Sequence, residues 1–360
     1  MAAIPDPMRQ IIRNHLAWFR AAMPADFDLG GASLGNLVLT GGYLHNARHL
    51  EPVVFLFSKL AGVRGTVCPI TDQDLHLAAE LTDGTTILGG DDKSGIAEII
   101  IAIKNLKDSG VSHAPIEVLI TVSEEIGLLG AKCFNKAKLS SAFGYALDTH
   151  QVGELVVGAP AQNSFIITVY GKDAHAGVEP EKGLNAIKIA SEAIAAMPMG
   201  RIDFETTCNV GKIWGGSATN IVPNQVVIKG EARSHNDQKL AQVCADIRHA
   251  VESTVARYNN EIGKAEYSFK METEYHSFAI AEEEEAVQLA ISALRGLDIP
   301  YTVCKGGGGS DANIINAAGI PMIIVGTGMN KVHTVAEDIE IEQLRRGVAF
   351  VEELIRQYSE

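Results

Sequence analysis

From position 91 onward, apolar residues recur at the spacings of alternating helices and strands. Apolar positions three and four apart predict helices, and short runs of branched apolar residues predict buried strands. In chain order, the pattern predicts a helix over 94–107, a strand over 116–122, a helix over 129–137 and a strand over 144–148. This alternation indicates a parallel sheet with helices on both faces, in which the chemistry lies at the carboxyl ends of the strands.

The pattern changes after about position 160. It then predicts a strand over 164–171, a helix over 183–197, strands around 206–213 and 225–233, and a helix over 237–258. This β-α-β-β-α-β order is typical of a small ferredoxin-like α+β domain with one open sheet. An edge strand of such a sheet can pair with a second chain.

The first pattern resumes from about position 274, with a helix over 282–297, a strand over 321–326 and a closing helix over 342–358. We therefore predict a discontinuous catalytic domain, formed by 1–160 and 274–360, with a doubly wound, mostly parallel α/β fold. The α+β domain, 161–273, is predicted to be inserted into it as a lid and dimerisation domain.

Composition narrows the classes of partner. The 360-residue chain is 46% hydrophobic and 21% charged, as is ordinary for a globular protein, and its net charge is −14. With a pI near 5.3, it has no basic stripe for nucleic acid or an anionic membrane, so small molecules or peptides are the expected partners. The helical pattern over 8–24 is interrupted by Arg13 and Arg20, which excludes a signal peptide or membrane span there. Five scattered cysteines without a C-x-x-C pair favour a reducing cytoplasm.

Two adjacent carboxylates, Asp91 and Asp92, lie in the stretch LGGDDKSG, where β-type residues give way to a helical pattern. Helix capping alone explains such a pair, because an Asp at a helix start accepts hydrogen bonds from free backbone N–H groups. Further acidic or imidazole side chains follow the predicted strands: Glu124, Glu125, Asp148 and His333. Each has an ordinary explanation as a turn or loop residue, but their matching positions indicate one shared site.

Adjacent glutamates have a chemical use that a single carboxylate cannot fill. One of them can hold a metal ion while the other stays free to take a proton from water. Zinc binds imidazole and carboxylate ligands in open tetrahedral sites, where it lowers the pKa of water to about 7. The combination of residues therefore predicts metal-dependent hydrolysis.

Eight motifs follow one another along the chain: DGTTILGGDDKSGIAEII, ITVSEEIGLLGAK, YALDTHQVGELVVGAP, KDAHAGVEPEKGLNAI, TNIVP, EARS, GGGGSDANI and VHT. Their order resembles that of the peptidase T-like metallopeptidases, dizinc aminopeptidases of the wider aminoacylase and carboxypeptidase group. The resemblance spans roughly 83–358. It implies a short peptide as substrate and a homodimer formed through the inserted domain.

The resemblance also implies a role for each matching residue. Asp91 would bridge two metal ions, Glu125 and His333 would bind one of them, and Asp148 would bind the other. Glu124 would be the general base. The implied roles around the substrate are support of the developing oxyanion by His175, which reaches a neighbouring subunit's site in dimeric relatives, and substrate binding by Asn220, Arg233, Gly308 and Ser310.

The substrate-side residues also have structural explanations. His175 could cap a helix near Gly177, Asn220 could close a turn before Pro223, and Arg233 could form a surface ion pair. For Asp92, we expect a supporting role behind the metal ligands or a helix cap.

One family motif is absent from its usual place. The family carries a His-x-Asp pair at the end of a strand before the Asp91 motif, whereas here the comparable stretch, PVVFLFSKLAG, has no histidine. The chain's His-x-Asp, 235–237, follows EARS within the lid and is typical of a helix start. His45, His49 and His76 lack an Asp at the required spacing.

The loss affects the two metal positions unequally. Asp91, Glu125 and His333 still provide three ligands with an open position, whereas the second position keeps only Asp91 and Asp148. We expect one or two ions, zinc first, with Mn²⁺ or Co²⁺ as alternatives. The leading hypothesis is a cytoplasmic peptidase in which a Glu124-activated water attacks a peptide carbonyl. The alternatives are a metal-poor, non-catalytic peptide-binding homologue and an amidohydrolase that acts on N-acyl amino acids.

Overall fold

The computed structural model describes residues 6–23, 34–46, 53 and 88–359. The chain divides into two compact units, Met1–Leu77 and Ala78–Glu360, which are described separately. Among the described residues, no helix is both long and apolar enough to cross a membrane.

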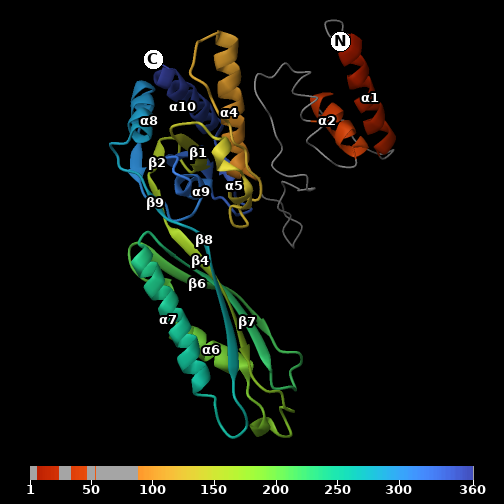
Figure 1. Cartoon of the computed structure of the whole chain (residues 1–360), viewed down its shortest axis with the longest axis vertical. Helices are drawn as coiled ribbons and strands as arrows, with labels where there is room; N and C mark the ends of the chain where they lie inside the picture. The colour runs from red at the N-terminus through yellow and green to blue at the C-terminus, as the bar shows by residue number, and fades with distance from the viewer. Residues whose placement is uncertain (1–5, 24–33, 47–52, 54–87, 360) are drawn as a thin grey trace. The chain divides into compact units, whose positions relative to one another are not determined.

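The first unit contains two packed helices, α1 (Asp6–Ala22) and α2 (Leu34–His45) (Figure 1). The helix expected over 8–24 is confirmed by α1. A Cβ atom at Gly41 would lie 1.9 Å from the His15 carbonyl oxygen, so glycine lets the two helices approach closely. His45 stacks on Trp18 with ring centroids 3.6 Å apart. His49, His76 and most of the PVVFLFSKLAG stretch lie outside the described residues.

The second unit holds a four-stranded sheet in the order β1 (Gly144–Thr149), β11 (Met322–Gly326), β2 (Glu154–Val156) and β10 (Thr302–Cys304). β1 pairs with β11 and β10 with β2 in parallel, whereas β11 and β2 are antiparallel. The prediction of a mostly parallel sheet is therefore confirmed.

Helices cover both faces of this sheet. Because successive residues of a strand point to opposite faces, neighbouring residues of β11 contact different helices. Ile323 and Val325 of β11 pack in one cluster with α4 (Gly90–Ser109), α8 (Glu285–Gly296) and α10 (Ile341–Ser359). Ile324 packs in another cluster with Ala312 of α9 (Asp311–Ala317). Two small ladders complete this part: β3 (Gly158–Ala159) pairs with β9 (Phe278–Ala279), and β12 (Met329–Asn330) pairs with β13 (Asp338–Ile339).

The strand expected over 116–122 is wrong, since the structure assigns no strand there. A strand needs a neighbour to take up its backbone hydrogen bonds, and β1 pairs with β11 instead, with no ladder to 116–122 within the described part. Ile116, Val118 and Ile120 are 36%, 45% and 43% exposed. Alternation of apolar residues therefore did not lead to burial in this segment.

The helix expected over 129–137 is shorter than predicted. α5 covers Leu129–Cys133 and ends at Phe134, whose backbone is extended. The Asn135 side chain then accepts a hydrogen bond from the backbone of Ala137 and starts a 3-10 turn, η1 (Lys136–Lys138). An Asn that satisfies local backbone donors competes with helix continuation.

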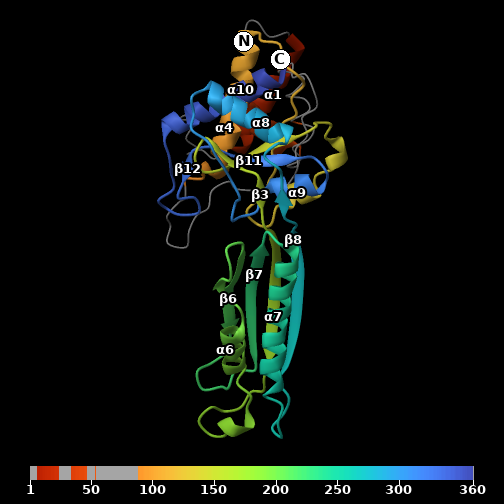
Figure 2. The ribbon, with the colours of Figure 1, turned by 90° about the vertical axis from the view of Figure 1, so that its left-hand side faces the viewer.

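The lid has the predicted element order. Its strands and helices are β4 (Ala161–Tyr170), η2 (Pro180–Lys182), α6 (Ala186–Ala196), β5 (Gly200–Arg201), β6 (Thr206–Gly215), β7 (Gln225–Ser234), α7 (Asp237–Ala256) and β8 (Glu266–Tyr275). The five strands form an antiparallel sheet in the order β5-β6-β7-β4-β8. Figure 2 shows α7 running along this sheet.

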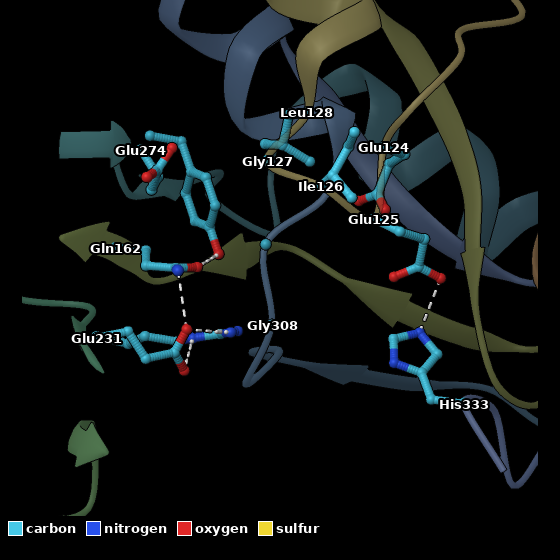
Figure 3. Close-up of a pocket in the computed structure, with 13 residues that line it drawn as sticks. Glu124, Glu125, Ile126, Gly127, Leu128, Gln162, Glu231, Glu274, Gly308 and His333 are labelled. Carbon is cyan, nitrogen blue, oxygen red and sulfur yellow. Dashed lines mark hydrogen bonds and ion pairs between the residues drawn. The ribbon is translucent and has the colours of Figure 1, made fainter. Parts of the chain in front are cut away.

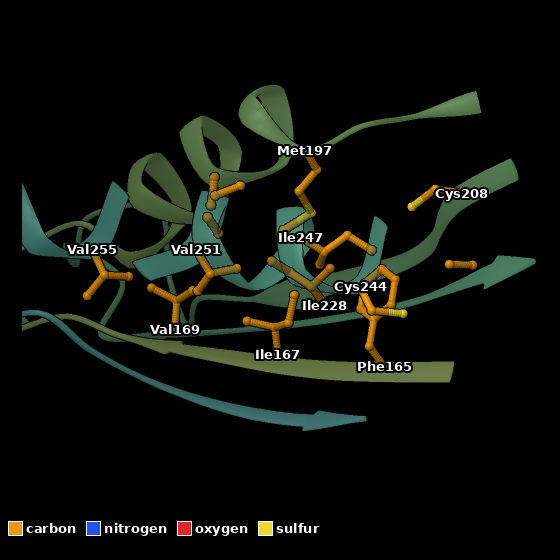
Figure 4. Packing of buried hydrophobic residues seen from close by; sticks show 14 of the residues in the cluster. Phe165, Ile167, Val169, Met197, Cys208, Ile228, Cys244, Ile247, Val251 and Val255 are labelled. Carbon is orange, nitrogen blue, oxygen red and sulfur yellow. The ribbon is translucent and has the colours of Figure 1, made fainter. Parts of the chain in front are cut away.

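The lid has its own hydrophobic core on the helix-covered face (Figure 4). Phe165 and Ile167 of β4, Ile228 of β7 and Ile247 of α7 are at most 1% exposed. Full burial of one such side chain contributes about 1.5–3 kcal/mol. A Cβ atom at Gly230 would lie 2.3 Å from the Phe165 ring, so this strand position needs glycine to admit the ring.

Candidate active site

The Asp91–Asp92 pair starts α4 and divides into two roles. Gly89 has φ of +67°, a left-handed conformation suited to glycine, and the chain turns there into the helix. The Asp92 carboxylate accepts a hydrogen bond from the Gly95 backbone N–H at 3.2 Å, which makes it the helix cap expected from the sequence. Asp91 instead directs Oδ2 toward His333.

Three side chains from distant segments meet at one point. His333 Nε2 lies 3.1 Å from Asp91 Oδ2 and 2.9 Å from Glu125 Oε1, and one ligand atom from each residue lies within 4.8 Å of the others. Figure 3 shows Glu125 pointing at the His333 ring. An imidazole nitrogen with two carboxylate oxygens is a donor set that catalytic zinc sites use. The cluster therefore fits one divalent ion, and the exposure of Glu125 and His333, 55% and 62%, leaves one side open.

Glu124 lies behind this cluster, in the tight turn that follows 116–122. The backbone N–H groups of Gly127 and Leu128 both donate to the Glu124 carbonyl oxygen, and Leu128 is left-handed with φ of +59°. Burial first, and then the nearby Asp148 carboxylate, together raise the pKa of the Glu124 carboxyl to about 9. The turn thus holds two adjacent glutamates in different environments, Glu125 exposed beside His333 and Glu124 half-buried.

Asp148, at the end of β1, is not a member of the three-residue cluster. It is partly buried, and desolvation raises the pKa of its carboxyl to about 7 although Ser310 hydrogen-bonds it. Ser310 is 2% exposed and also caps α9 by accepting a hydrogen bond from the Ala312 backbone. The roles of Asp148 as a metal ligand and of Ser310 as a substrate binder stay predictions.

A cavity of about 420 Å³ opens beside the cluster (Figure 3). Its lining comes from the catalytic part and from the lid: Glu124, Glu125, Ile126, Gly127, Leu128, Gln162, Glu231, Arg233, Glu274, Tyr275, Gly308, Gly309 and His333. Of the residues predicted around the substrate, Arg233 and Gly308 line this cavity. A Cβ atom at Gly309 would lie 2.2 Å from the Tyr275 ring, so glycine is needed where this loop meets the ring.

Arg233 is held by a chain of hydrogen bonds. Its Nε and Nη2 donate to the two carboxylate oxygens of Glu231, both at 3.0 Å. Gln162 donates to the same carboxylate at 2.8 Å, and the Tyr275 hydroxyl donates to Gln162 at 2.6 Å. One edge of the guanidinium is therefore occupied by Glu231, while Nη1 would lie 3.9 Å from a Cβ atom at Gly308. The ion pair expected as a structural alternative is present, but its partner is part of the cavity wall.

His175 and Asn220 lie together but do not line this cavity. The Ala176 N–H donates to the Asn220 carbonyl oxygen at 2.9 Å, and His175 Nδ1 accepts from the Gly177 N–H at 3.2 Å. Both residues follow the ends of β4 and β6 that are remote from the catalytic part, where Tyr170 pairs with Gln225. β4 is ten residues long, so this end lies about 30 Å from Ala161 at its other end.

Sequence reasoning missed four side chains that shape the site: Glu231, Gln162, Tyr275 and Glu337. Glu231 had a signal, because it lies two residues before Arg233 and alternate strand residues share a face. The other three come from distant segments and carry no local signal. The only described His-x-Asp starts α7, as expected, and His235 Nε2 lies 2.8 Å from the Gly306 carbonyl oxygen.

The chain matches two family models and several known proteins. Residues 161–259 match the peptidase dimerisation domain, and residues 4–130 match a 2-phospho-L-lactate transferase CofD model. An uncharacterized protein of Bacillus subtilis, YqjE, is 39% identical over 332 residues, 92% of this chain and 86% of its own. Two crystal structures each cover 78% of this chain and 76% of theirs: aminopeptidase PepT from Bacillus cereus, at 40% identity and a TM-score of 0.68, and a tripeptidase from Staphylococcus aureus, at 38% and 0.71.

An α/β catalytic part, an inserted lid and an Asp–Glu–His cluster beside a cavity define a metal-dependent peptidase. At 40% identity to a solved aminopeptidase PepT, the chain belongs to the peptidase T-like metallopeptidases of the M20 family. The CofD match covers about a third of the chain and includes the first unit's described helices and α4.

Proposed function

We propose that this protein hydrolyses short peptides, tripeptides among them, with one zinc ion held by Asp91, Glu125 and His333. The observation that carries the proposal is the meeting of these three ligand atoms within 4.8 Å at the mouth of a cavity that also exposes Glu124. When bound, the ion supplies a positive charge that polarises the peptide carbonyl and lowers the pKa of nearby water and of Glu124.

The residues of the chain divide the remaining work. Glu124 takes a proton from the attacking water as the oxygen–carbon bond forms, and it returns a proton to the leaving nitrogen as the carbon–nitrogen bond breaks. Arg233 binds the peptide carboxylate through Nη1, because Glu231 already occupies its other edge. The Gly308 backbone borders the peptide at the cavity wall, and Ser310 supports that loop.

We also propose a homodimer that forms through the lid, in which His175 and Asn220 of one copy reach the cavity of the other. The match to a peptidase dimerisation domain supports this arrangement. The remote position of both residues from their own chain's cavity supports it as well, since an oxyanion donor must lie within hydrogen-bond distance of the reacting carbonyl. A cytoplasmic location remains our expectation from the scattered free cysteines.

The two alternative functions have less support. Amide-hydrolysing structures resemble this chain at 18% identity, which speaks for a shared fold alone, whereas the peptidases reach 38–40%. The three converging ligand atoms, with the half-buried Glu124 beside them, favour a catalytic site over a non-catalytic peptide-binding site. A second ion at Asp91 and Asp148, and Mn²⁺ or Co²⁺ in place of zinc, stay open to metal analysis.

A Glu124→Gln variant tests the proposal. We expect its tripeptide hydrolysis to fall by about 10²–10⁴-fold, as for the loss of a general base, while metal content stays at about one ion per chain. Glu283→Gln, at an exposed position, is the control and should hydrolyse at the parent rate. Parent-like turnover in Glu124→Gln, or a parent protein that retains no metal, would overturn the proposal.

A further inference from the structure

We infer that Glu337 is a positioning residue that holds the Asp91 loop against the His333 loop and thereby sets the affinity of the metal site. The inference rests on the proposed function, because it concerns the same three ligands. Glu337 is 8% exposed, and it lies outside both the cavity lining and the ligand cluster.

Both carboxylate oxygens of Glu337 are used. Oε2 accepts a hydrogen bond from the Gly89 N–H at 2.6 Å, and Oε1 accepts one from the Asp91 N–H at 3.0 Å. These N–H groups stand at the start of α4, where a helix has free donors and favours negative charge. The Gly89–Asp91 turn is thus bound to a residue almost 250 positions later in the chain.

The same short segment carries His333. Glu337 lies four residues after it, and the Glu337 N–H donates to the Thr334 carbonyl oxygen at 3.1 Å. The segment is closed at its base by the pairing of β12 with β13 and by an ion pair of Lys331 with Asp338 at 2.8 Å. We call the two hydrogen bonds from the Gly89 and Asp91 N–H groups to the Glu337 carboxylate the Glu337 clamp. His333 is attached to this clamp through four residues of a closed loop, and Asp91 is attached to it through its own backbone N–H.

The clamp needs two acceptors at this side-chain length. A glutamine has one acceptor oxygen, and its NH₂ group would face a backbone N–H donor. An aspartate is one methylene shorter and cannot reach both donors from the same backbone. Groups that orient metal ligands typically change metal affinity by 10–100-fold when removed. The structure therefore assigns Glu337 a role that its charge alone does not fulfil.

The test uses the full chain with Co²⁺ alone as the probe, followed by visible absorption. We expect Glu337→Gln to bind Co²⁺ about 10–100-fold more weakly and to recover most of its kcat for a tripeptide in excess Co²⁺, with KM close to that of the parent. Glu340→Gln, an exposed glutamate three residues later, is the matched control and should bind Co²⁺ like the parent. Parent-like Co²⁺ affinity in Glu337→Gln, with only a lower melting temperature, would reduce Glu337 to a general structural role and overturn the inference.

A second measurement, on the parent protein, tests the inference even if Glu337→Gln does not fold. In the ion-free parent, amide hydrogen exchange should be slow at Gly89 and Asp91, because both N–H groups are bonded to Glu337. Exchange at the rate of free amides would overturn the clamp. Failure of the proposed function would give different results from failure of the Glu337 inference. In that case Glu124→Gln would keep its turnover, or His333→Ala would bind Co²⁺ as well as the parent does.

Discussion

At the scale of single residues, Glu98 is an unusual group that the catalytic proposal does not use. It projects from α4, is 1% exposed, and neither carboxylate oxygen has a hydrogen-bond partner in the described part of the chain. A Cβ atom at Gly347 of α10 would lie 2.2 Å from Glu98 Oε1, so the two helices meet at this carboxyl group. Burial first, and then the Asp92 carboxylate, together raise the pKa of Glu98 to about 9.

Glu98 should make the stability of the ion-free protein depend on pH. Its pKa is about 9 when folded, against an ordinary value of 4.5, so the folded state binds more protons across that window. Its share of the unfolding free energy is then present below pH 4.5 and is lost as pH rises toward 9, at up to about 1.4 kcal/mol per pH unit. Glu98→Gln should remove this share of the slope in urea unfolding measured across the window. Glu272→Gln, at an exposed position, is the control and should leave the pH slope of the unfolding free energy unchanged. Equal slopes in the parent and in Glu98→Gln would contradict the raised pKa of Glu98.

At the scale of elements, local signals set helix ends while strand formation depended on neighbours. Asn236 caps α7, its side chain accepting from the backbone of Gln238 and Lys239 at 2.9 and 3.1 Å. The segment 116–122, by contrast, has the composition of a buried strand but pairs with no other described strand and is partly exposed.

The loss of the α7 cap should have a modest effect confined to stability. Asn236→Ala is expected to lower the unfolding free energy by about 1 kcal/mol, because two N–H groups at the helix start lose their acceptor. Gln238→Ala, at an exposed position on the same helix, is the control and should change it far less. Urea denaturation measures both, and equal effects would argue against the cap.

A pair of identical truncations tests the exposed segment. Ile323→Ala, in β11 at 0% exposure, should cost about 2–5 kcal/mol of unfolding free energy through lost burial and a cavity. Ile120→Ala, at 43% exposure, should cost less than about 1 kcal/mol. If Ile120→Ala were as destabilising as Ile323→Ala, the segment would be buried in solution and the expected strand would regain support.

At the scale of the whole molecule, the lid offers an edge for a second chain. β5 pairs with β6 only at Gly200 and Arg201, so the edge of β6 beyond Cys208 is unpaired among the described strands. Ile213 and Trp214 on it are 50% and 48% exposed. An unpaired edge with exposed apolar residues is a surface suited to strand addition.

A charge on this edge should separate the proposed dimer. Ile213→Lys is expected to shift the protein from dimer to monomer in light scattering, because a lysine opposes edge pairing. Tripeptide hydrolysis should fall with it, since His175 would no longer reach the neighbouring cavity that we propose it serves, while Co²⁺ binding stays unchanged. Ile101→Lys, on an exposed position of α4, is the control. A dimeric and active Ile213→Lys would place the interface elsewhere.

Much of the fold could be predicted from the sequence, because helix and strand periods are local. The lid's β-α-β-β-α-β order and the helices α4, α7, α8 and α10 follow from the spacing of apolar residues. The convergence of Asp91, Glu125 and His333 was also predicted, from the family resemblance as well as from expected element ends, although the strand expected before Glu125 is not assigned. The prediction of a strand over 116–122 was wrong, since strand pairing depends on a partner strand that no local pattern reveals.

The sequence by itself determined which residue types stand near the ends of which elements, and so which carboxylates and imidazoles were available for the proposed metal site. Only the tertiary structure decided that Glu231 occupies one edge of Arg233, that Glu337 binds the Asp91 loop, and that His175 lies far from its own chain's cavity. The physical reason is range: periodicity and capping act over a few residues, whereas hydrogen bonds and burial join segments that are distant along the chain.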